Sequence, residues 1–201
     1  MILLIAVAAG LVAGCGQARA TGRKPVFPQL RDSWLVVLAM IPQLLAFHIV
    51  SVRAHFPGAW VTPTLVITQL ILLVFVVRNA SHPGFWIIGL GLVCNLLVIL
   101  LNGGLMPISP EIVKQIAPHA FPSGIPVGSR YGWSKDIILP REGTLLWPLS
   151  DLFLLPDWLP YRAAFSIGDV LISAGIFWLF IYQPKLTSHL TTNERANPIF
   201  Q

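Results

Sequence analysis

The sequence predicts an all-α, polytopic membrane protein: a bundle of about five transmembrane helices with an irregular loop over its outer end. Five apolar stretches are each long enough to cross a hydrocarbon core about 30 Å thick, which takes roughly 20 helical residues. Hydrophobic residues make up 55% of the 201 residues and charged residues only 10%, against about 25% in ordinary soluble domains. Basic residues also gather in alternate connections between these stretches.

The apolar stretches divide one membrane domain, residues 1–201, into helices and connections. The expected spans are about 1–18, 33–52, 61–78, 84–103 and 163–183. Pro42 is expected to kink the second span, because proline removes a backbone hydrogen bond. Trp34, Trp60 and Trp86 lie at predicted helix ends, where tryptophan anchors a helix at the membrane surface.

The first span is interpreted as an uncleaved helix. Val12-Ala13-Gly14-Cys15 resembles a lipobox, in which Cys15 would be lipidated, but a signal peptide needs basic residues before its apolar run. Here they follow it. Ala6, Gly10 and Gly14 are spaced by four and predict a packing face for a helix of this or another chain. The alternative is a chance occurrence of small residues.

The charge distribution predicts an orientation in a bacterial inner membrane, with the N-terminus outside and the C-terminus in the cytoplasm. The basic segments 19–32, 78–83 and 184–201 are placed inside, and 53–61 and 103–162 outside. This placement accounts for the net charge of +5. Because the basic residues form no single patch and no nucleic-acid motif accompanies them, nucleic acid is excluded as a partner.

Segment 103–162 is expected to form an ordered cap over the outer mouth of the bundle. It is too long for a plain connection and too apolar for disorder. Ser109-Pro110-Glu111 has the residue types that begin a helix, which predicts a short helix from Glu111 to Ala117. The apolar run 145–160 is broken by prolines and is expected to lie in the outer interface rather than to span.

Three amides are expected to share one level near the membrane midplane. Gln43, Gln69 and Asn95 each lie roughly 12–14 Å from the outer end of their helix, at about 1.5 Å per residue. Such side chains usually bond across helices, so they are interpreted as structural contacts. The alternative is a polar cavity for a small ligand or a quinone-like headgroup.

Asp169 is the only acidic residue in the predicted spans. Ser166, Asp169 and Ser173 are spaced by three and four residues and so form one polar stripe. A carboxylate inside the membrane is costly unless it is paired, protonated or hydrated. Asp169 is therefore expected either to accept N–H bonds that fasten the outer loop, or to carry a proton or cation. The expected partners are Asn102, the backbone amides of Gly103 and Gly104, Arg162 or Arg53.

His48 is the only histidine in a predicted span. It is a candidate ligand for haem or chlorophyll, with a hydrogen-bonded interhelical histidine as the alternative. A bis-histidine haem within this chain is excluded because no second histidine lies in a span. The sequence contains no Walker A, H-E-x-x-H, C-x-x-C-H or G-x-S-x-G motif, and we predict no catalytic or metal-binding residues.

Two blocks carry a resemblance to a known family: N-L-L-V-x-x-x-N-G-G-x-M-P, from Asn95 to Pro107, and S-x-G-D, from Ser166 to Asp169. Together they resemble an uncharacterised family of bacterial multi-span membrane proteins. The resemblance implies no established activity. It marks as motif positions Asn95, Asn102, Gly103, Gly104, Met106, Pro107 and Asp169.

The function predicted from these observations is that of a non-catalytic accessory subunit that stabilises a larger membrane complex, either photosynthetic or respiratory. Its expected partners are membrane lipids and other integral membrane subunits. Lipid, quinone, (bacterio)chlorophyll or carotenoid could bind against its apolar surface. The alternative function is a small transporter or a proton-coupled membrane enzyme that uses Asp169.

Overall fold

The computed structural model describes residues 2–22, 29–122, 124–159 and 161–181, and this part of the chain is mostly helical. The predicted C-terminal tail, 184–201, lies outside the described residues. The helices are α1 (Ile2–Ala20), α2 (Trp34–Phe47), α3 (Val50–Arg53), α4 (Gly58–Arg78), α5 (Pro83–Leu101), α6 (Pro110–Ile116) and α7 (Ile167–Ile181). The short strands are β1 (Met106–Ile108), β2 (Asp136–Ile138), β3 (Phe153–Leu154) and β4 (Ala164–Phe165).

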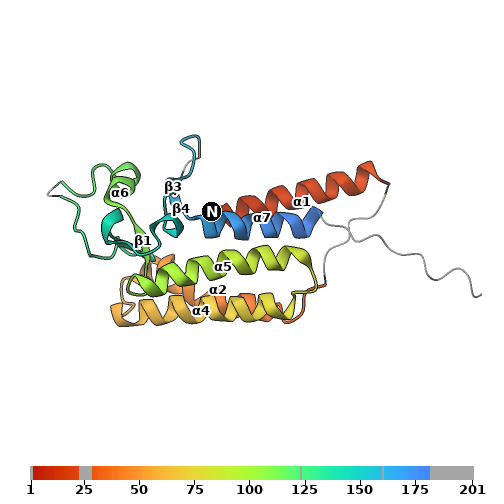
Figure 1. Cartoon of the computed structure of the whole chain (residues 1–201), viewed down its shortest axis with the longest axis horizontal. Coiled ribbons are helices and arrows are strands. Elements are labelled where there is room, and N and C mark those ends of the chain that lie inside the picture. The colour runs from red at the N-terminus through yellow and green to blue at the C-terminus, as the bar shows by residue number, and fades with distance from the viewer. Residues whose placement is uncertain (1, 23–28, 123, 160, 182–201) are drawn as a thin grey trace, which may run out of the picture.

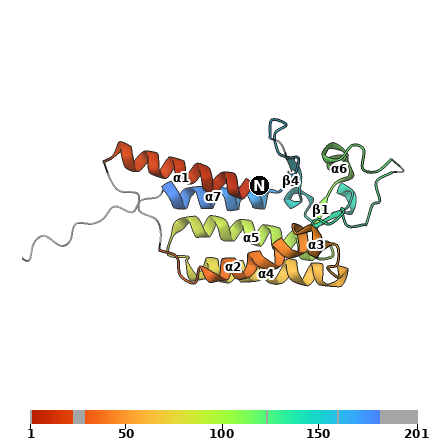
Figure 2. The ribbon, with the colours of Figure 1, turned by 180° about the vertical axis from the view of Figure 1, so that it is seen from behind.

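Five of these helices lie side by side along the long axis of the molecule (Figure 1). α1 packs on α7, α7 on α5, α5 on α4, and α4 on α2. The chain between α5 and α7 forms a cap at one end of this bundle, next to α3 and the start of α1, as the view from behind also shows (Figure 2). The cap expected over residues 103–162 is therefore ordered, but it contains a helix and strands as well as irregular chain.

Two of the described helices, α4 and α5, are long and apolar enough to cross a membrane on length and composition. Three more apolar helices are shorter: Ile5–Ala20 within α1, α2, and α7. The structure thus gives weak support for membrane association and supports two spans on this criterion, not the five expected. Two of the predicted spans are shortened because the chain leaves the helical conformation near their cap ends.

The second predicted span, 33–52, is wrong at its C-terminal end. Pro42 lies inside α2, yet the helix continues to Phe47 before it ends. Ile49 is extended, and only one further turn, α3, follows. The last predicted span starts later than expected, because residues 164–165 belong to β4 and α7 begins at Ile167. By contrast, α5 nearly coincides with the expected 84–103.

Glycines allow α5 and α7 to approach backbone to backbone. A Cβ atom added to Gly91 would lie 2.5 Å from the carbonyl oxygen of Gly168, and one added to Gly175 would lie 2.6 Å from that of Gly84. The two glycines on each helix are seven residues apart, so each helix presents them on one face. This contact brings the polar residues at the start of α7 against α5.

The predicted packing face of the first helix also meets α7. A Cβ atom on Gly10 would lie 2.8 Å from Phe180 Cδ2, and one on Gly14 would lie 2.5 Å from the carbonyl oxygen of Phe180. Ala6 precedes Gly10 by one turn and is half-buried. Gly10 and Gly14 therefore pack within the chain.

β1 is the central strand of the cap. It pairs in parallel with β2, and on its other side Ile108 forms a bridge with Asp151. The predicted short helix is confirmed as α6, with the Ser109 side chain accepting the N–H of Ile112. The apolar run 145–160 contains no α-helix among its described residues, as the prolines predict. Ile108, Val113 and Ile138 form the apolar core beneath α6.

Candidate functional site

Polar side chains meet where α7 begins beneath the cap. Ser166 immediately precedes α7, and its Oγ accepts the backbone N–H of Asp169 at 3.1 Å. In return Asp169 Oδ2 accepts the backbone N–H of Ser166 at 3.0 Å. This reciprocal pair is a capping box, which satisfies two N–H groups that the first turn of a helix leaves without partners.

Asn95 of α5 completes this network. Its Nδ2 donates to Asp169 Oδ1 at 3.1 Å, and its Oδ1 accepts the Ser166 hydroxyl at 2.9 Å. Both Asn95 and Ser166 are buried. Each carboxylate oxygen of Asp169 therefore accepts a hydrogen bond from within the chain, and the network joins α5 to α7.

The described hydrogen bonds of Asp169 involve other partners than those expected. Asn95 and Ser166 supply them, rather than Asn102 or the backbone amides of Gly103 and Gly104, and Arg162 donates to the Gln115 carbonyl at 3.1 Å. The Arg53 side chain lies outside the described residues. The reason is the axial position of the N-terminus of α7: it lies level with Asn95, about 1.7 turns before the end of α5.

Asn102 bonds to the cap rather than to Asp169. Its Nδ2 donates to the carbonyls of Val98, at 2.7 Å, and Leu145, at 2.9 Å, while its Oδ1 accepts the Leu145 N–H at 2.9 Å. Asn102 thus fastens the 145 region of the cap to the end of α5. Gly104 follows with φ +85°, and a Cβ atom there would clash with Thr62 of α4.

A second polar cluster, in the cap, contains one cation and two carboxylates. Lys135 Nζ lies 2.6 Å from Asp151 Oδ2 and 3.1 Å from Asp136 Oδ1. The Asp151 side chain is only 2% exposed, whereas that of Lys135 is 38% exposed. Strand β1 positions both residues, because the Met106 N–H donates to the Lys135 carbonyl and the Asp151 N–H donates to the Pro107 carbonyl.

The two clusters interact electrostatically. Burial raises the pKa of Asp151; Lys135 opposes that rise, and the nearby carboxylates of Asp136 and Asp169 add to it. Burial alone would lower the pKa of Lys135, but Asp136, Asp151 and Asp169 outweigh it and raise that pKa. Lys135 therefore remains an ammonium ion. Asp151 Oδ1 is buried and has no hydrogen-bond partner among the described residues.

The cap cluster was missed in the sequence. Asp151 is the one acidic residue within the apolar run 145–155, and a lone acid in such a run is a signal of a buried, paired carboxylate. Its partner could not be found this way. Lys135 is sixteen residues away, and only the pairing of both segments with β1 brings the two side chains together.

The three amides predicted to share one level, Gln43, Gln69 and Asn95, show no hydrogen bonds to one another among the described residues. Gln43 Nε2 donates to Thr68 Oγ1 at 2.7 Å, across α2 and α4, whereas Asn95 bonds Ser166 and Asp169. Gln69 Oε1 and Ser173 Oγ are buried without a hydrogen-bond partner in the described part of the chain. Ser173 is therefore not part of the Asp169 network.

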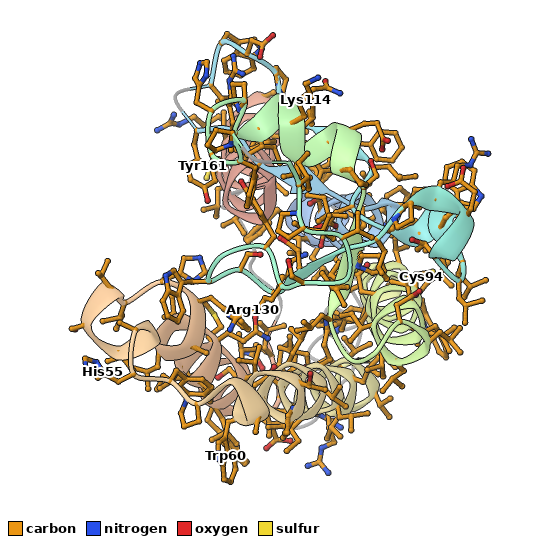
Figure 3. All side chains as sticks on the ribbon, turned by 90° about the vertical axis from the view of Figure 1, so that its left-hand side faces the viewer. His55, Trp60, Cys94, Lys114, Arg130 and Tyr161 are labelled. Atoms are coloured by element: carbon orange, nitrogen blue, oxygen red, sulfur yellow. The ribbon has the colours of Figure 1, made fainter. Side chains whose placement is uncertain are left out.

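His48 follows the last residue of α2 and is exposed. Nearby, the Arg130 guanidinium lies 5.6 Å from the centre of the Phe47 ring, so the cap also touches the end of α2. Figure 3, seen along the bundle from the cap end, shows Arg130 between the cap and the lower helices. Among the described residues, no group of three His, Cys, Asp or Glu side chains could hold a metal ion.

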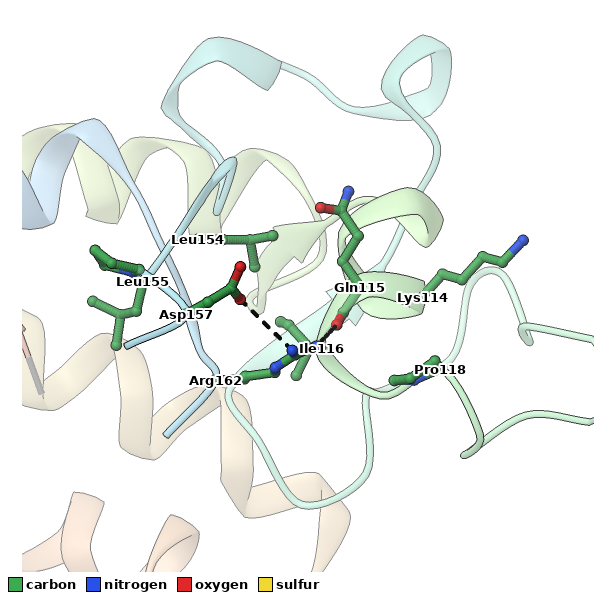
Figure 4. A pocket seen from close by; sticks show the side chains of 9 residues that line it. Lys114, Gln115, Ile116, Pro118, Leu154, Leu155, Asp157 and Arg162 are labelled. Carbon is green, nitrogen blue, oxygen red and sulfur yellow. Dashed lines mark hydrogen bonds and ion pairs between the residues drawn. The ribbon is translucent and has the colours of Figure 1, made fainter. Parts of the chain in front are cut away.

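A shallow pocket of about 410 Å³ lies in the cap between α6 and the segment around β3 (Figure 4). Lys114 and Arg162 line it, but Arg162 is engaged with the Gln115 carbonyl and lies 3.6 Å from Asp157. Arg162 is therefore occupied by its contact with the C-terminal end of α6.

Taken together, the fold and the site define a helical protein with two apolar helices of spanning length and a charged cap fastened to them by asparagines. The chain belongs to a family of unknown function, DUF5317, whose family model matches residues 28–181. That range contains both sequence blocks from Asn95 to Pro107 and from Ser166 to Asp169. No curated protein and no solved structure matches the chain.

Proposed function

We propose that the chain is a five-helix integral membrane protein of the bacterial inner membrane, and that it acts as a non-catalytic accessory subunit whose cap binds other integral membrane subunits. The observation that carries the proposal is apolar surface on the cap. In the part of the cap between α6 and β2, Val127 is 57% exposed and Trp133 is 47% exposed. Large apolar side chains that remain exposed on the cap favour a protein partner.

The arrangement of the helices supports the membrane part of the proposal. The shorter helices α1, α2 and α7 lie alongside α4 and α5 (Figure 1). A bilayer crossed by α4 and α5 would therefore surround all five helices. Arg19 and Arg78 lie in the last turns of α1 and α4, and Arg31 lies just before α2, all at the end opposite the cap. The positive-inside rule then places the cap outside.

The surroundings of Asp169 favour an accessory subunit over a transporter or a proton-coupled enzyme. Its carboxylate accepts hydrogen bonds from the Ser166 N–H and the Asn95 amide, and these bonds cap α7 and join it to α5. A carboxylate used in this way stabilises a helix junction. These bonds favour the structural role of Asp169 over the transfer of a proton or cation.

Native purification followed by mass spectrometry tests the partner. We expect the tagged wild-type protein, extracted from its own membrane, to carry other integral membrane subunits with it. Trp133→Ala should release them, whereas Trp86→Ala, which removes a tryptophan that is 69% exposed at the opposite end of the bundle, should not. A wild-type protein that purifies as a lone monomer would contradict the proposal.

Cysteine labelling tests the topology separately. In a protein in which Cys15 and Cys94 are replaced by alanine, single cysteines would be introduced by Glu142→Cys in the cap and Ser81→Cys between α4 and α5. Both positions are exposed. An impermeant maleimide should label the cap position in intact spheroplasts and the other only after lysis. Labelling of both positions in intact spheroplasts would sink the five-span arrangement.

A further inference from the structure

Asp151 is a buried carboxylate with a spare oxygen. Its side chain is 2% exposed, Oδ2 lies 2.6 Å from Lys135 Nζ, and Oδ1 has no hydrogen-bond partner among the described residues. An ionised carboxylate in this position loses the hydration of Oδ1 and gains nothing there in exchange. A neutral carboxyl group avoids much of that cost.

The charges that face Asp151 come from each element packed around it. β2 and the residue before it contribute Asp136 and Lys135, α7 contributes Asp169, and β1 contributes no charged residue. Arg130 and Tyr131 lie close enough to Asp136 to interact with it electrostatically. Two cations, Lys135 and Arg130, therefore interact with three carboxylates, which leaves excess negative charge unless one carboxylate takes up a proton.

We propose that Asp151 is a reversible proton-binding site on the cap, and that its protonation strengthens the attachment of the cap to the helix bundle. The proton comes from water on the cap side and bonds to a carboxylate oxygen of Asp151, which becomes neutral. The Lys135 ammonium then neutralises Asp136 more fully. Repulsion among Asp136, Asp151 and Asp169 falls, and these three residues lie on both sides of the boundary between cap and bundle.

The sign of the pH effect follows from the pKa of Asp151, which burial raises above that of the unfolded chain, against the opposing effect of Lys135. The folded protein then holds the proton more tightly than the unfolded chain does. The stability that it contributes is complete below the unfolded pKa and is lost as the pH rises through the folded pKa. The cap should therefore be held most firmly in acid and less firmly at higher pH.

Infrared titration of the full chain in detergent micelles tests the site. We expect the wild-type protein to show a carboxylic-acid carbonyl band that disappears at a pH clearly above the ordinary aspartate range near about 3.9. Asp151→Asn should abolish this band. Asp157→Asn is the matched control, because that cap carboxylate is 91% exposed, and it should leave the band unchanged. A band that survives in Asp151→Asn, or its absence from the wild type, would overturn the proposal.

A second variant covers the case in which Asp151→Asn does not fold. Asp136→Asn removes one of the repelling carboxylates and leaves Lys135 free to pair with Asp151. The midpoint of the band should then move to lower pH by about one unit. An unchanged midpoint would contradict the assignment to Asp151. Neither measurement needs a partner subunit, so the proton site stands or falls independently of the proposed function.

Discussion

Asn79 and Asn102 make the same three hydrogen bonds at opposite ends of the helix bundle. Each follows the last residue of a long helix, α4 or α5, and donates from Nδ2 to a carbonyl four residues earlier. Each side chain also accepts a hydrogen bond from the backbone N–H of one distant residue and donates one to its carbonyl: Arg31 for Asn79 and Leu145 for Asn102. One local device therefore holds a short connection at one end and the cap at the other.

The surroundings of these two asparagines differ in how charge is treated. Near Asn79, Arg78 pairs with Asp32 at 2.8 Å, and the arginine side chain is 60% exposed. At the cap end, Lys135 pairs at 2.6 Å with an aspartate that is almost fully buried. Both partners of the ion pair at the uncapped end are therefore in contact with solvent, whereas at the cap end the carboxylate is buried and only the lysine is partly exposed.

Lys135→Met should have the largest effect at a pH where Asp151 is ionised, because it leaves that buried carboxylate without its cation. We expect a loss of about 3–5 kcal/mol in the free energy of unfolding, measured by denaturant titration in detergent. The double variant Lys135→Met/Asp151→Leu removes both charges and should recover much of this loss. Equal instability of the single and double variants would show that packing, and not charge, dominates at this end.

Gly168→Ala compares the two glycine contacts between α5 and α7. A Cβ atom at Gly168 clashes with the Asn95 side chain as well as with the Gly91 backbone, so we expect a loss of about 1–3 kcal/mol and a weakened Asn95–Asp169 bond. Gly175→Ala meets Ile88 and the Gly84 backbone and should cost stability without touching that network. Gly16→Ala in α1, with open space around it, should be neutral or slightly stabilising.

Asn102→Ala and Asn79→Ala test whether each asparagine stabilises only its own end of the bundle. Each removes a buried amide and leaves backbone groups without partners, so each should cost about 1–3 kcal/mol. Hydrogen exchange separates them: Asn102→Ala should speed exchange in the 144–151 region, and Asn79→Ala should not. Faster exchange in that region of both variants would mean that the ends of the bundle are coupled.

Arg78→Ala should have the smallest effect. The pair with Asp32 is largely exposed and screened, so the expected loss is about 0–1 kcal/mol, and added salt should reduce it further. The same denaturant titration, repeated at low and high salt, measures it. A loss comparable to that of Lys135→Met would erase the distinction between the two ends.

Local signals in the sequence predicted local structure well. The helix α5, the cap helix begun by Ser109-Pro110 and the absence of an α-helix in the proline-rich run all follow from residue types over a few positions. The break of α2 at Ile49 was not predicted, because Ile49, Val50 and Val52 continue the apolar run of the helix before it.

Distant contacts account for what the sequence could not predict. Asp169 was expected beside the turn at 102–104, but its partner is Asn95, since the glycine contact with α5 sets how far α7 reaches along the bundle. Asn79 was not predicted to be a structural residue, although it makes the same kinds of hydrogen bond as Asn102. No sequence pattern near Asn79 indicates that it contacts Arg31. Lys135 and Asp151 are brought together only by their common neighbour β1.

The packing of α1 on α7 has a consequence for synthesis of the protein. α1 has its main partner in α7, which is synthesised much later, and 146 residues separate Ala20 from Ile167. At about 5–20 residues per second, translation of that interval takes roughly 7–30 s. Until α7 arrives, the glycine faces of α1 and α5 and the Asn95 amide lack their helix partner. Docking of α7 is therefore the step that completes the helix packing.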